Sequence, residues 1–404
     1  MKHSIYRHRQ HGFTLTEILV GIAIGLFSIL VMYKALQSSN VVSSNVSGGA
    51  DSSVNAQIAL YLLERDILMA GYGINHANAV GCNIAYSNDN VTLPTDITGG
   101  QAIFAPVSGS RLNGGNIVQL RDANDWPLLR VAYAGNKYVA NAKLTRDFNG
   151  ANQPLTVTNA YGMDTPGNVL LITANPDMGN ALTGCMIRQT TGTTSNEIQI
   201  AAGGGAGMNN STGLSMQNYQ TNDYKVFNIG SVAGVNANLP ANWPMWNEYR
   251  VNPLTATLEV RNLFMETAYR PVAQNVIDMR VEYVLTDGTI QQMGDRIQAM
   301  KDGTSNNLGT SAGWNRITGV RVALLTRSTA PDYSKGAACR TNPNDANTIT
   351  QPNSPELQSK FRTNTGALVA PFVLDRTRVP EAHCYRYKIQ ESIITMRNMT
   401  WRPV

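Results

Sequence analysis

The sequence contains few of the residues that catalytic and metal sites need. Of its 5 histidines, only His76 and His383 lie beyond the first twelve residues, and neither belongs to an HExxH motif. A Gly-x-Ser-x-Gly element is absent. The glycine-rich run 203–207 lacks the Gly-Lys-Ser/Thr ending of a phosphate-binding loop, so we interpret it as a surface loop. The sequence therefore predicts a protein that is not an enzyme and that holds no metal and no cofactor.

Charged residues are also scarce. Asp, Glu, Lys and Arg make up 15% of the 404 residues, and the formal net charge is +5. Three of the positive charges, Lys2, Arg7 and Arg9, lie at the N-terminus, and the other basic residues are dispersed. A nucleic-acid-binding surface needs clustered Lys and Arg. We therefore predict no nucleic-acid partner.

Only 4 cysteines are present, Cys82, Cys185, Cys339 and Cys384, and no two form a CxxC pair. That spacing disfavours a zinc site and a thioredoxin-like redox site. An even number of cysteines in a glycine-rich chain outside the cytoplasm favours disulfides, and four cysteines allow three connectivities. Pairing within each half of the domain predicts Cys82–Cys185 and Cys339–Cys384.

The one long hydrophobic run is near the N-terminus. Between Phe13 and Tyr33 the only charged residue is Glu17, and these 21 residues would form a helix of about 30 Å. That length spans the hydrocarbon core of a bilayer. An unpaired carboxylate in apolar surroundings is costly, so Glu17 needs a partner. Cleavage between Gly12 and Phe13 would supply one, because Phe13 would then carry a free α-amino group, in the same or a neighbouring subunit.

The basic leader, the sequence Gly12-Phe13-Thr14-Leu15-Thr16-Glu17 and the apolar run together resemble the class III signal of type IV pilins and pseudopilins. The resemblance implies that prepilin peptidase removes residues 1–12 as a leader and methylates the amino group of Phe13. It also implies that Glu17 acts in assembly and that 13–33 is the membrane-spanning and filament-core half of a long helix.

The second half of that helix is predicted over residues 34–73. Apolar residues recur at three- and four-residue steps and lie on one helical face: Ala56, Leu60, Leu63, Ile67 and Ala70. Glu64, Arg65 and Asp66 are expected off that face, and Gly71 and Gly73 are expected to end the helix.

Alternating patterns follow from about Ile74. The clearest strand is 277–285, which ends in the hairpin turn Asp287-Gly288, and further strands are predicted at 319–327 and 385–393. Weaker candidates are 117–121, 128–134, 169–173, 197–201, 224–230 and 255–261. The predicted fold is α+β, pilin-like: a long N-terminal helix packed on antiparallel sheet. The globular domain, 74–404, would carry large loop-rich β insertions, with a possible second sheet or subdomain at about 100–260.

Several segments resemble PilW-type minor pilins: 63–67, 70–73, 276–285, 321–325 and 396–399. The resemblance implies a structural, non-enzymatic subunit that initiates or caps a type IV pilus. Its partners would be other minor pilins and the major pilin, through the N-terminal helix, together with prepilin peptidase and the inner membrane. The globular domain would lie in the periplasm and later in the fibre, at or near its tip.

Two alternatives remain at the level of sequence. A large J-type pseudopilin of a type II secretion system would carry the same signal and fold. A tip-displayed adhesin or DNA-uptake subunit could use the long polar loops. The stretch Trp243-Pro244-Met245-Trp246 is interpreted as core packing, with an exposed binding patch as the alternative.

Overall fold

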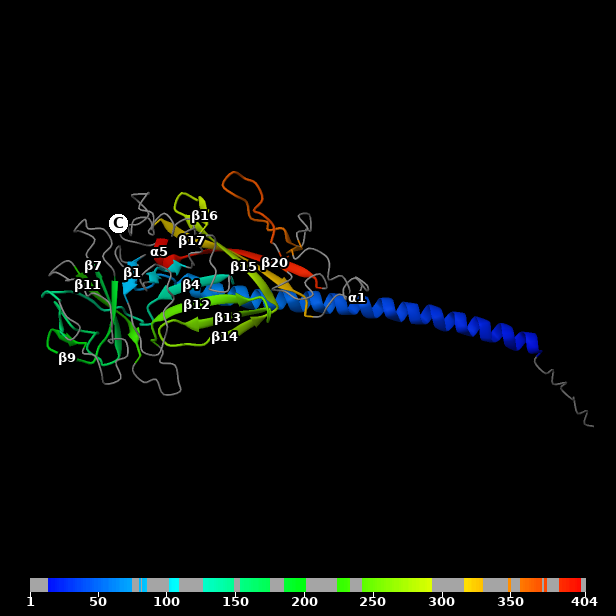
Figure 1. Cartoon of the computed structure of the whole chain (residues 1–404), viewed down its shortest axis with the longest axis horizontal. Coiled ribbons are helices and arrows are strands. Elements are labelled where there is room, and N and C mark those ends of the chain that lie inside the picture. Colours follow the sequence, from blue (N-terminus) through cyan, green and yellow to red (C-terminus); the bar gives the residue numbers. More distant parts are fainter. Residues whose placement is uncertain are drawn as a thin grey trace, which may run out of the picture.

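A computed structural model describes residues 14–74, 80, 82–85, 102–108, 126–148, 153–174, 185–200, 224–232, 242–292, 316–329, 348–349, 357–372, 374–375 and 385–400. The fold is α+β. One long helix, α1 (Leu15–Met69), leaves a β-rich globular domain and projects beyond it as a single rod (Figure 1). A short helix, α5 (Arg397–Thr400), lies near the C-terminal end.

Helix α1 begins and ends at residues suited to those positions. Thr14 caps the N-terminus, and the helix continues without a break through Ser47-Gly48-Gly49-Ala50. Past Met69, Gly71 and Gly73 adopt positive φ angles of 80° and 70°. Residues with a Cβ atom rarely adopt such angles, and glycine commonly follows the end of a helix for that reason.

The predicted apolar face of α1 is buried, as expected from its spacing. Ala56, Leu60, Leu63, Ile67 and Ala70 all belong to the core. The prediction that Asp66 lies off this face was wrong, because Asp66 is fully buried. Its carboxylate is held by polar side chains of a sheet far away in the sequence, and helical spacing alone cannot reveal such partners.

Two sheets enclose this half of the helix. The four-stranded sheet has the order β16-β15-β17-β20, and the five-stranded sheet has the order β14-β13-β12-β4-β3. The main core lies between α1 and the inner faces of both sheets. The strands of the four-stranded sheet are β15 (Val276–Leu285), β16 (Ile290–Gln292), β17 (Ile317–Arg327) and β20 (Tyr387–Thr395). Those of the five-stranded sheet are β3 (Val107–Ser108), β4 (Leu128–Tyr133), β12 (Met245–Asn252), β13 (Thr257–Asn262) and β14 (Arg270–Gln274).

A six-stranded sheet, order β2-β1-β8-β7-β11-β5, lies at the end of the domain remote from the projecting helix (Figure 1). Among its described strands, β1 and β8 pair in parallel and the other neighbours are antiparallel. A three-stranded sheet, β6-β10-β9, shares a hydrophobic cluster with it. The strands are β1 (Cys82–Ala85), β2 (Ala102–Phe104), β5 (Asn141–Lys143), β6 (Leu155–Thr156), β7 (Asn168–Ala174), β8 (Cys185–Gln189), β9 (Gly192–Thr194), β10 (Glu197–Gln199) and β11 (Tyr224–Ser231).

The segment 357–372 covers the outer face of the four-stranded sheet. The guanidinium of Arg321 pairs with Glu282 inside the sheet and donates to the carbonyl of Arg362 at 2.7 Å. Arg280 donates to the carbonyl of Ala370 at 2.6 Å. These contacts explain why β17 is buried on both faces. The small sheet β18 (Thr348–Ile349) with β19 (Leu374–Asp375) completes the described strands.

The predicted strands at 277–285, 319–327 and 385–393 correspond to β15, β17 and β20. The Asp287-Gly288 turn is confirmed: Gly288 has a φ of 77°, and β15 pairs with β16 across it. The candidate strand 117–121 lies outside the described residues. The weaker candidates at 128–134, 169–173, 197–201, 224–230 and 255–261 correspond to β4, β7, β10, β11 and β13. Strands β8, β12 and β14 were not predicted, nor were the short strands β1, β2, β3, β5, β6, β9, β18 and β19.

Candidate functional site

The start of α1 forms a closed hydrogen-bonded cap. Thr14 has the extended conformation of an N-cap residue, and its hydroxyl accepts from the amide of Glu17 at 3.3 Å. In return the Glu17 carboxylate accepts from the Thr14 amide at 2.9 Å. This reciprocal capping box satisfies two amide groups that a helix otherwise leaves without acceptors. Glu17 therefore has a local role in starting the helix.

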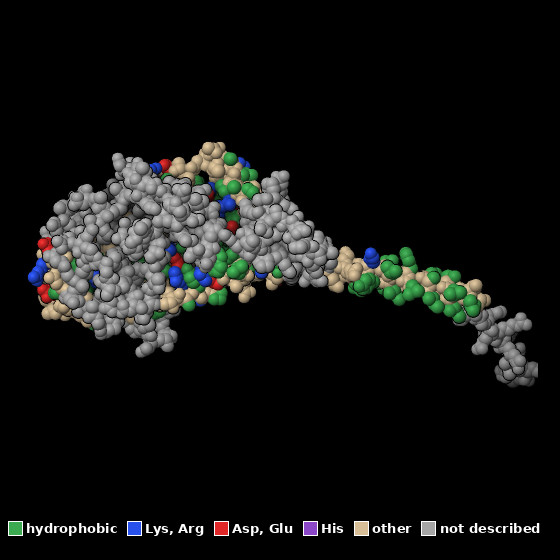
Figure 2. Space-filling view, in the orientation of Figure 1, with side chains coloured by type: hydrophobic (Ala, Val, Ile, Leu, Met, Phe, Trp, Pro, Cys, Tyr) green, Lys and Arg blue, Asp and Glu red, His purple; other side chains and the backbone are tan. Residues whose placement is uncertain are grey.

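Beyond this cap the helix is an exposed apolar rod. Leu15–Asn40 is long and apolar enough to cross a membrane, by length and composition. Its large side chains are open to the surroundings; the side chain of Leu15 is 76% exposed and that of Phe27 is 71% exposed. Figure 2 shows the hydrophobic side chains gathered along this projecting part. A rod of this kind needs lipid or other apolar helices around it, because so large an apolar surface is unfavourable in water.

A buried polar cluster joins the other half of α1 to the five-stranded sheet. Asp66 lies on the helix, and its Oδ2 accepts from Tyr249 Oη at 2.6 Å and from Asn247 Nδ2 at 2.7 Å. Its Oδ1 accepts from Tyr133 Oη at 3.2 Å and from Arg65 Nε at 3.1 Å. The donors come from β12, β4 and the helix itself. The carboxylate thus fixes the helix against two adjacent strands.

Burial and the Asp66 charge act together on the two phenols. Both raise the pKa of Tyr249, and both raise the pKa of Tyr133, so each hydroxyl stays protonated as a donor. Such a satisfied network specifies one orientation of helix against sheet, because a shifted register would leave buried polar groups without partners.

A second ionic network lies around Glu248, whose neighbours Asn247 and Tyr249 face the helix. Glu248 pairs with Arg130 at 2.7 Å and with Arg261 at 2.6 Å, and Tyr269 donates to the same carboxylate. Burial alone would raise the pKa of Glu248, but these two cations and the Tyr269 hydroxyl lower it below the ordinary value. Strand β12 thus carries buried polar groups on both faces, which explains why its sequence showed no clear alternation.

The predicted site residues are described only in part. Gly12 and Phe13 lie outside the described residues, as do Cys339 and Cys384. Cys185 is disulfide-bonded. The backbone of Cys82 lies in β1, where Ile84 pairs with Cys185 of β8, so the chain around Cys82 runs beside Cys185. The pairing Cys82–Cys185 stays a prediction. Within the described ranges, no group of three His, Cys, Asp or Glu side chains could hold a metal ion.

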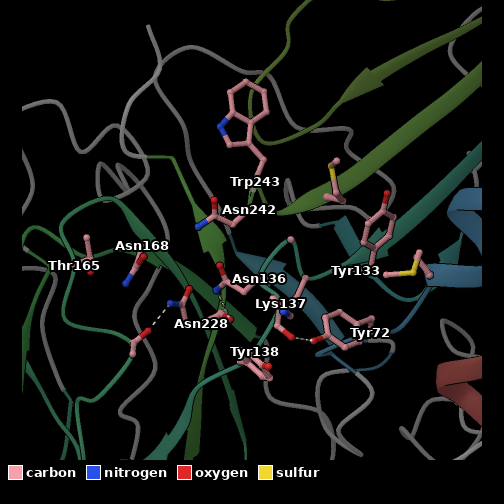
Figure 3. A pocket seen from close by; sticks show the side chains of 15 residues that line it. Tyr72, Tyr133, Asn136, Lys137, Tyr138, Thr165, Asn168, Asn228, Asn242 and Trp243 are labelled. Atoms are coloured by element: carbon pink, nitrogen blue, oxygen red, sulfur yellow. Dashed lines mark hydrogen bonds between the residues drawn. The ribbon is translucent and has the colours of Figure 1, made fainter. Parts of the chain in front are cut away.

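A pocket of about 740 Å³ lies where the end of α1 meets the five- and six-stranded sheets. Figure 3 shows its labelled side chains converging from the segment after α1, from the turn after β4 and from the six-stranded sheet. Its lining is aromatic and amide-rich, with one lysine: Tyr72, Tyr133, Tyr138, Trp243, Asn136, Asn168, Asn228, Asn242, Thr165 and Lys137. Sequence reasoning missed this pocket, because its residues come from distant loops and strand ends.

The aromatic pair in Trp243-Pro244-Met245-Trp246 divides between two roles. Trp246 is fully buried and contacts Phe104 edge-on at a centroid distance of 5.3 Å, as the core interpretation predicted. Trp243 instead lines the pocket.

Comparison with known proteins gives two matches to protein families. Residues 247–398 match the family described as type IV pilus-assembly protein W. Residues 7–33 match the prokaryotic N-terminal methylation motif. Neither the curated proteins nor the solved structures contain a match. The first match covers β13, β15, β17 and β20, which form or adjoin the helix-binding sheets, and the second covers the cap and the start of the exposed rod.

Proposed function

We propose that this chain is a type IV pilin-like protein and, more finely, a minor pilin that initiates or caps the fibre. Its matches to the pilus-assembly family and to the N-terminal methylation motif support the proposal. The observation that carries the proposal is the exposed apolar rod, Leu15–Asn40, capped by Thr14 and Glu17 and continuous with a helix anchored in a folded domain. Such a rod can move from the membrane into a bundle of neighbouring apolar helices, because both places surround it with apolar groups. The role is structural and non-enzymatic.

The proposal assigns each region a stage in that exchange. Residues 1–12 are removed as a leader by prepilin peptidase, and Phe13 becomes the methylated N-terminus. Residues 13–33 hold the subunit in the inner membrane, 34–73 carry the second half of the helix, and 74–404 form the periplasmic domain. After assembly the rod contacts other minor pilins and the major pilin.

Glu17 is proposed to act when the subunit leaves the membrane. In α1 its carboxylate accepts from the amide and the hydroxyl of Thr14, both at 2.9 Å. A carboxylate so positioned at the start of the helix can also accept from an α-amino group of a neighbouring subunit. That contact gains strength in dry surroundings, where charges are poorly screened.

The test is a chromosomal Glu17→Ala strain beside a deletion strain, with pili counted by electron microscopy. We expect both strains to lose most pili, while the variant protein stays at normal level in the inner membrane. Removing one charge from the apolar run does not hinder insertion. Glu64→Ala, farther along the same helix, is the matched control and should piliate normally. Normal piliation of the Glu17 variant at normal protein level would contradict the docking role.

The same strains distinguish the pseudopilin alternative. A deletion that leaves pili unchanged but abolishes secretion of a type II substrate would assign the chain to a secretion pseudopilus. Loss of pili with normal secretion would support the assignment of the chain to a type IV pilus.

A further inference from the structure

The pocket contains polar groups that the fold does not use. Asn168 is only 6% exposed and lines the pocket, yet its side-chain amide makes no hydrogen bond in the described part of the chain. The indole Nε1 of Trp243 is buried and likewise has no acceptor there. Buried polar groups nearly always have partners, so unpaired ones need an explanation. Of these two, the Asn168 amide is not among the side-chain atoms closed to solvent, so it is free to bond a ligand in the pocket that brings its own donors and acceptors.

The walls of the pocket are held in place by groups other than these. Asn228 Nδ2 donates to the carbonyl of Gly162 at 2.6 Å, and Asn136 Nδ2 donates to the carbonyl of Asn228 at 3.1 Å (Figure 3). The hydroxyl of Tyr72 donates to the carbonyl of Lys137. A Cβ at Gly135 would lie 1.7 Å from the carbonyl oxygen of Trp243, so only glycine permits this close approach. The pocket is therefore preformed, which lowers the entropy lost on binding.

The lining residues narrow the class of ligand. Lys137 is the only Lys, Arg, Asp or Glu among the described lining residues, so neither a divalent cation nor a polyanion such as nucleic acid is favoured. The lining residues belong to strand ends, to turns and to strands already paired with neighbours, which disfavours an added peptide strand. Rigid aromatic faces beside amide groups suit a ligand with both apolar faces and many hydroxyls.

We propose that this pocket binds a saccharide that is uncharged or carries a single negative charge. An aromatic ring, with Tyr138 at the mouth, would cover the C–H face of a sugar ring. Asn168, Asn242 and Thr165 would bond its hydroxyls. Lys137, whose ammonium lies 5.6 Å from the centre of the Tyr138 ring, would pair with a carboxylate where the sugar has one. The volume of about 740 Å³ is in the range that holds ligands of several rings.

The chain offers a matched pair of variants. Tyr138 is 80% exposed and lines the pocket, whereas Tyr161 is 83% exposed and does not. Replacing either with Ala should leave the fold intact, because surface substitutions of this kind change stability little. Asn168→Ala removes an amide that supports no described contact, and Lys137→Gln removes the cation alone.

The full chain is placed in lipid nanodiscs without glycolipid or sugar-based detergent. It is titrated with maltotriose, chitotriose and trigalacturonate, and binding is followed by saturation-transfer NMR and tryptophan fluorescence. We expect at least one trisaccharide to bind. Tyr138→Ala should weaken it roughly three- to tenfold, Asn168→Ala roughly two- to tenfold, and Tyr161→Ala not at all. Lys137→Gln should weaken only the acidic probe.

Absence of binding by all three probes would overturn the proposal, as would equal affinity in Tyr138→Ala and the unaltered chain. An equal loss in Tyr161→Ala would also overturn it, by showing that the contact is not at the pocket. Tyr138→Ala keeps the test decisive if Asn168→Ala does not fold. The result is independent of pilus counts, so failure of this proposal and failure of the assembly role are told apart.

Discussion

Replacement of Asp66 by Ala should weaken the attachment of α1 to the five-stranded sheet and so lower the stability of the domain. The change leaves Tyr249 Oη and Asn247 Nδ2, which donate to Asp66 at 2.6 and 2.7 Å, buried without an acceptor. Each orphaned group costs about 1–3 kcal/mol, and removing one partner of a buried charged network costs about 3–5 kcal/mol. In a domain of this size each kcal/mol lowers the melting temperature by about 2 °C. We therefore expect Asp66→Ala to melt about 6–10 °C below the unaltered protein.

The assay is thermal unfolding of the full chain in nanodiscs, followed by near-ultraviolet circular dichroism. Glu64→Ala is the control, because Glu64 lies two residues earlier on the same helix and is only half-buried. Asp66→Asn should be intermediate, since the carboxamide keeps one acceptor oxygen but places an NH2 group among donors. An Asp66→Ala protein that melts within about 2 °C of the Glu64→Ala control would refute the reasoning.

Three further outcomes follow from the same structure. Burial raises the pKa of the phenols of Tyr133, Tyr249 and Tyr269, and the nearby carboxylate of Asp66 or Glu248 raises it further. The stability that these phenols contribute is therefore complete below the ordinary phenol pKa of about 10 and is lost as the pH rises above it. Absorbance of their tyrosinate forms should appear only together with unfolding. Mass spectrometry of the mature protein should find methylated Phe13 at the N-terminus, and an intact Met1 in cells with active peptidase would contradict cleavage after Gly12. Non-reducing peptide mapping should pair Cys185 with Cys82, and a bridge from Cys185 to another cysteine would reject that pairing.

The sequence predicted those elements whose burial has a simple period. Strand β15 alternates Met279, Val281 and Tyr283 of the main core with polar residues, and its hairpin turn carries the expected glycine. Ile277 lies at a β-bulge and packs on the outer face of the sheet instead. The buried face of α1 follows the same logic at helical spacing. These patterns are local, because each residue's environment is decided by the face on which it lies.

The burial of Asp66 could not be predicted from local sequence patterns. Within Glu64-Arg65-Asp66 all three residues have the composition of a solvated helical surface, and only Asp66 is buried. What distinguishes it is the arrival of Asn247 and Tyr249, more than 180 residues later in the chain. The pocket is a stronger case, since the ligand-binding role proposed for Asn168 depends on its amide having no partner within the described part of the chain. No spacing in the sequence encodes the absence of a hydrogen bond.

The proportions of the molecule bear on the position proposed for it in a fibre. Apolar helices pack with their axes about 8–10 Å apart. A domain of about 330 residues, such as 74–404, has a radius of gyration near 20 Å. Copies of so broad a domain cannot lie side by side at the same height while their helices keep that spacing, so neighbouring copies would have to be staggered along the fibre. A single copy at one end of a fibre meets no such conflict, and there the pocket, at the opposite end of α1 from Thr14, would face away from the membrane. The proposed tip position avoids that need for stagger and would give the proposed saccharide-binding pocket access to the surroundings.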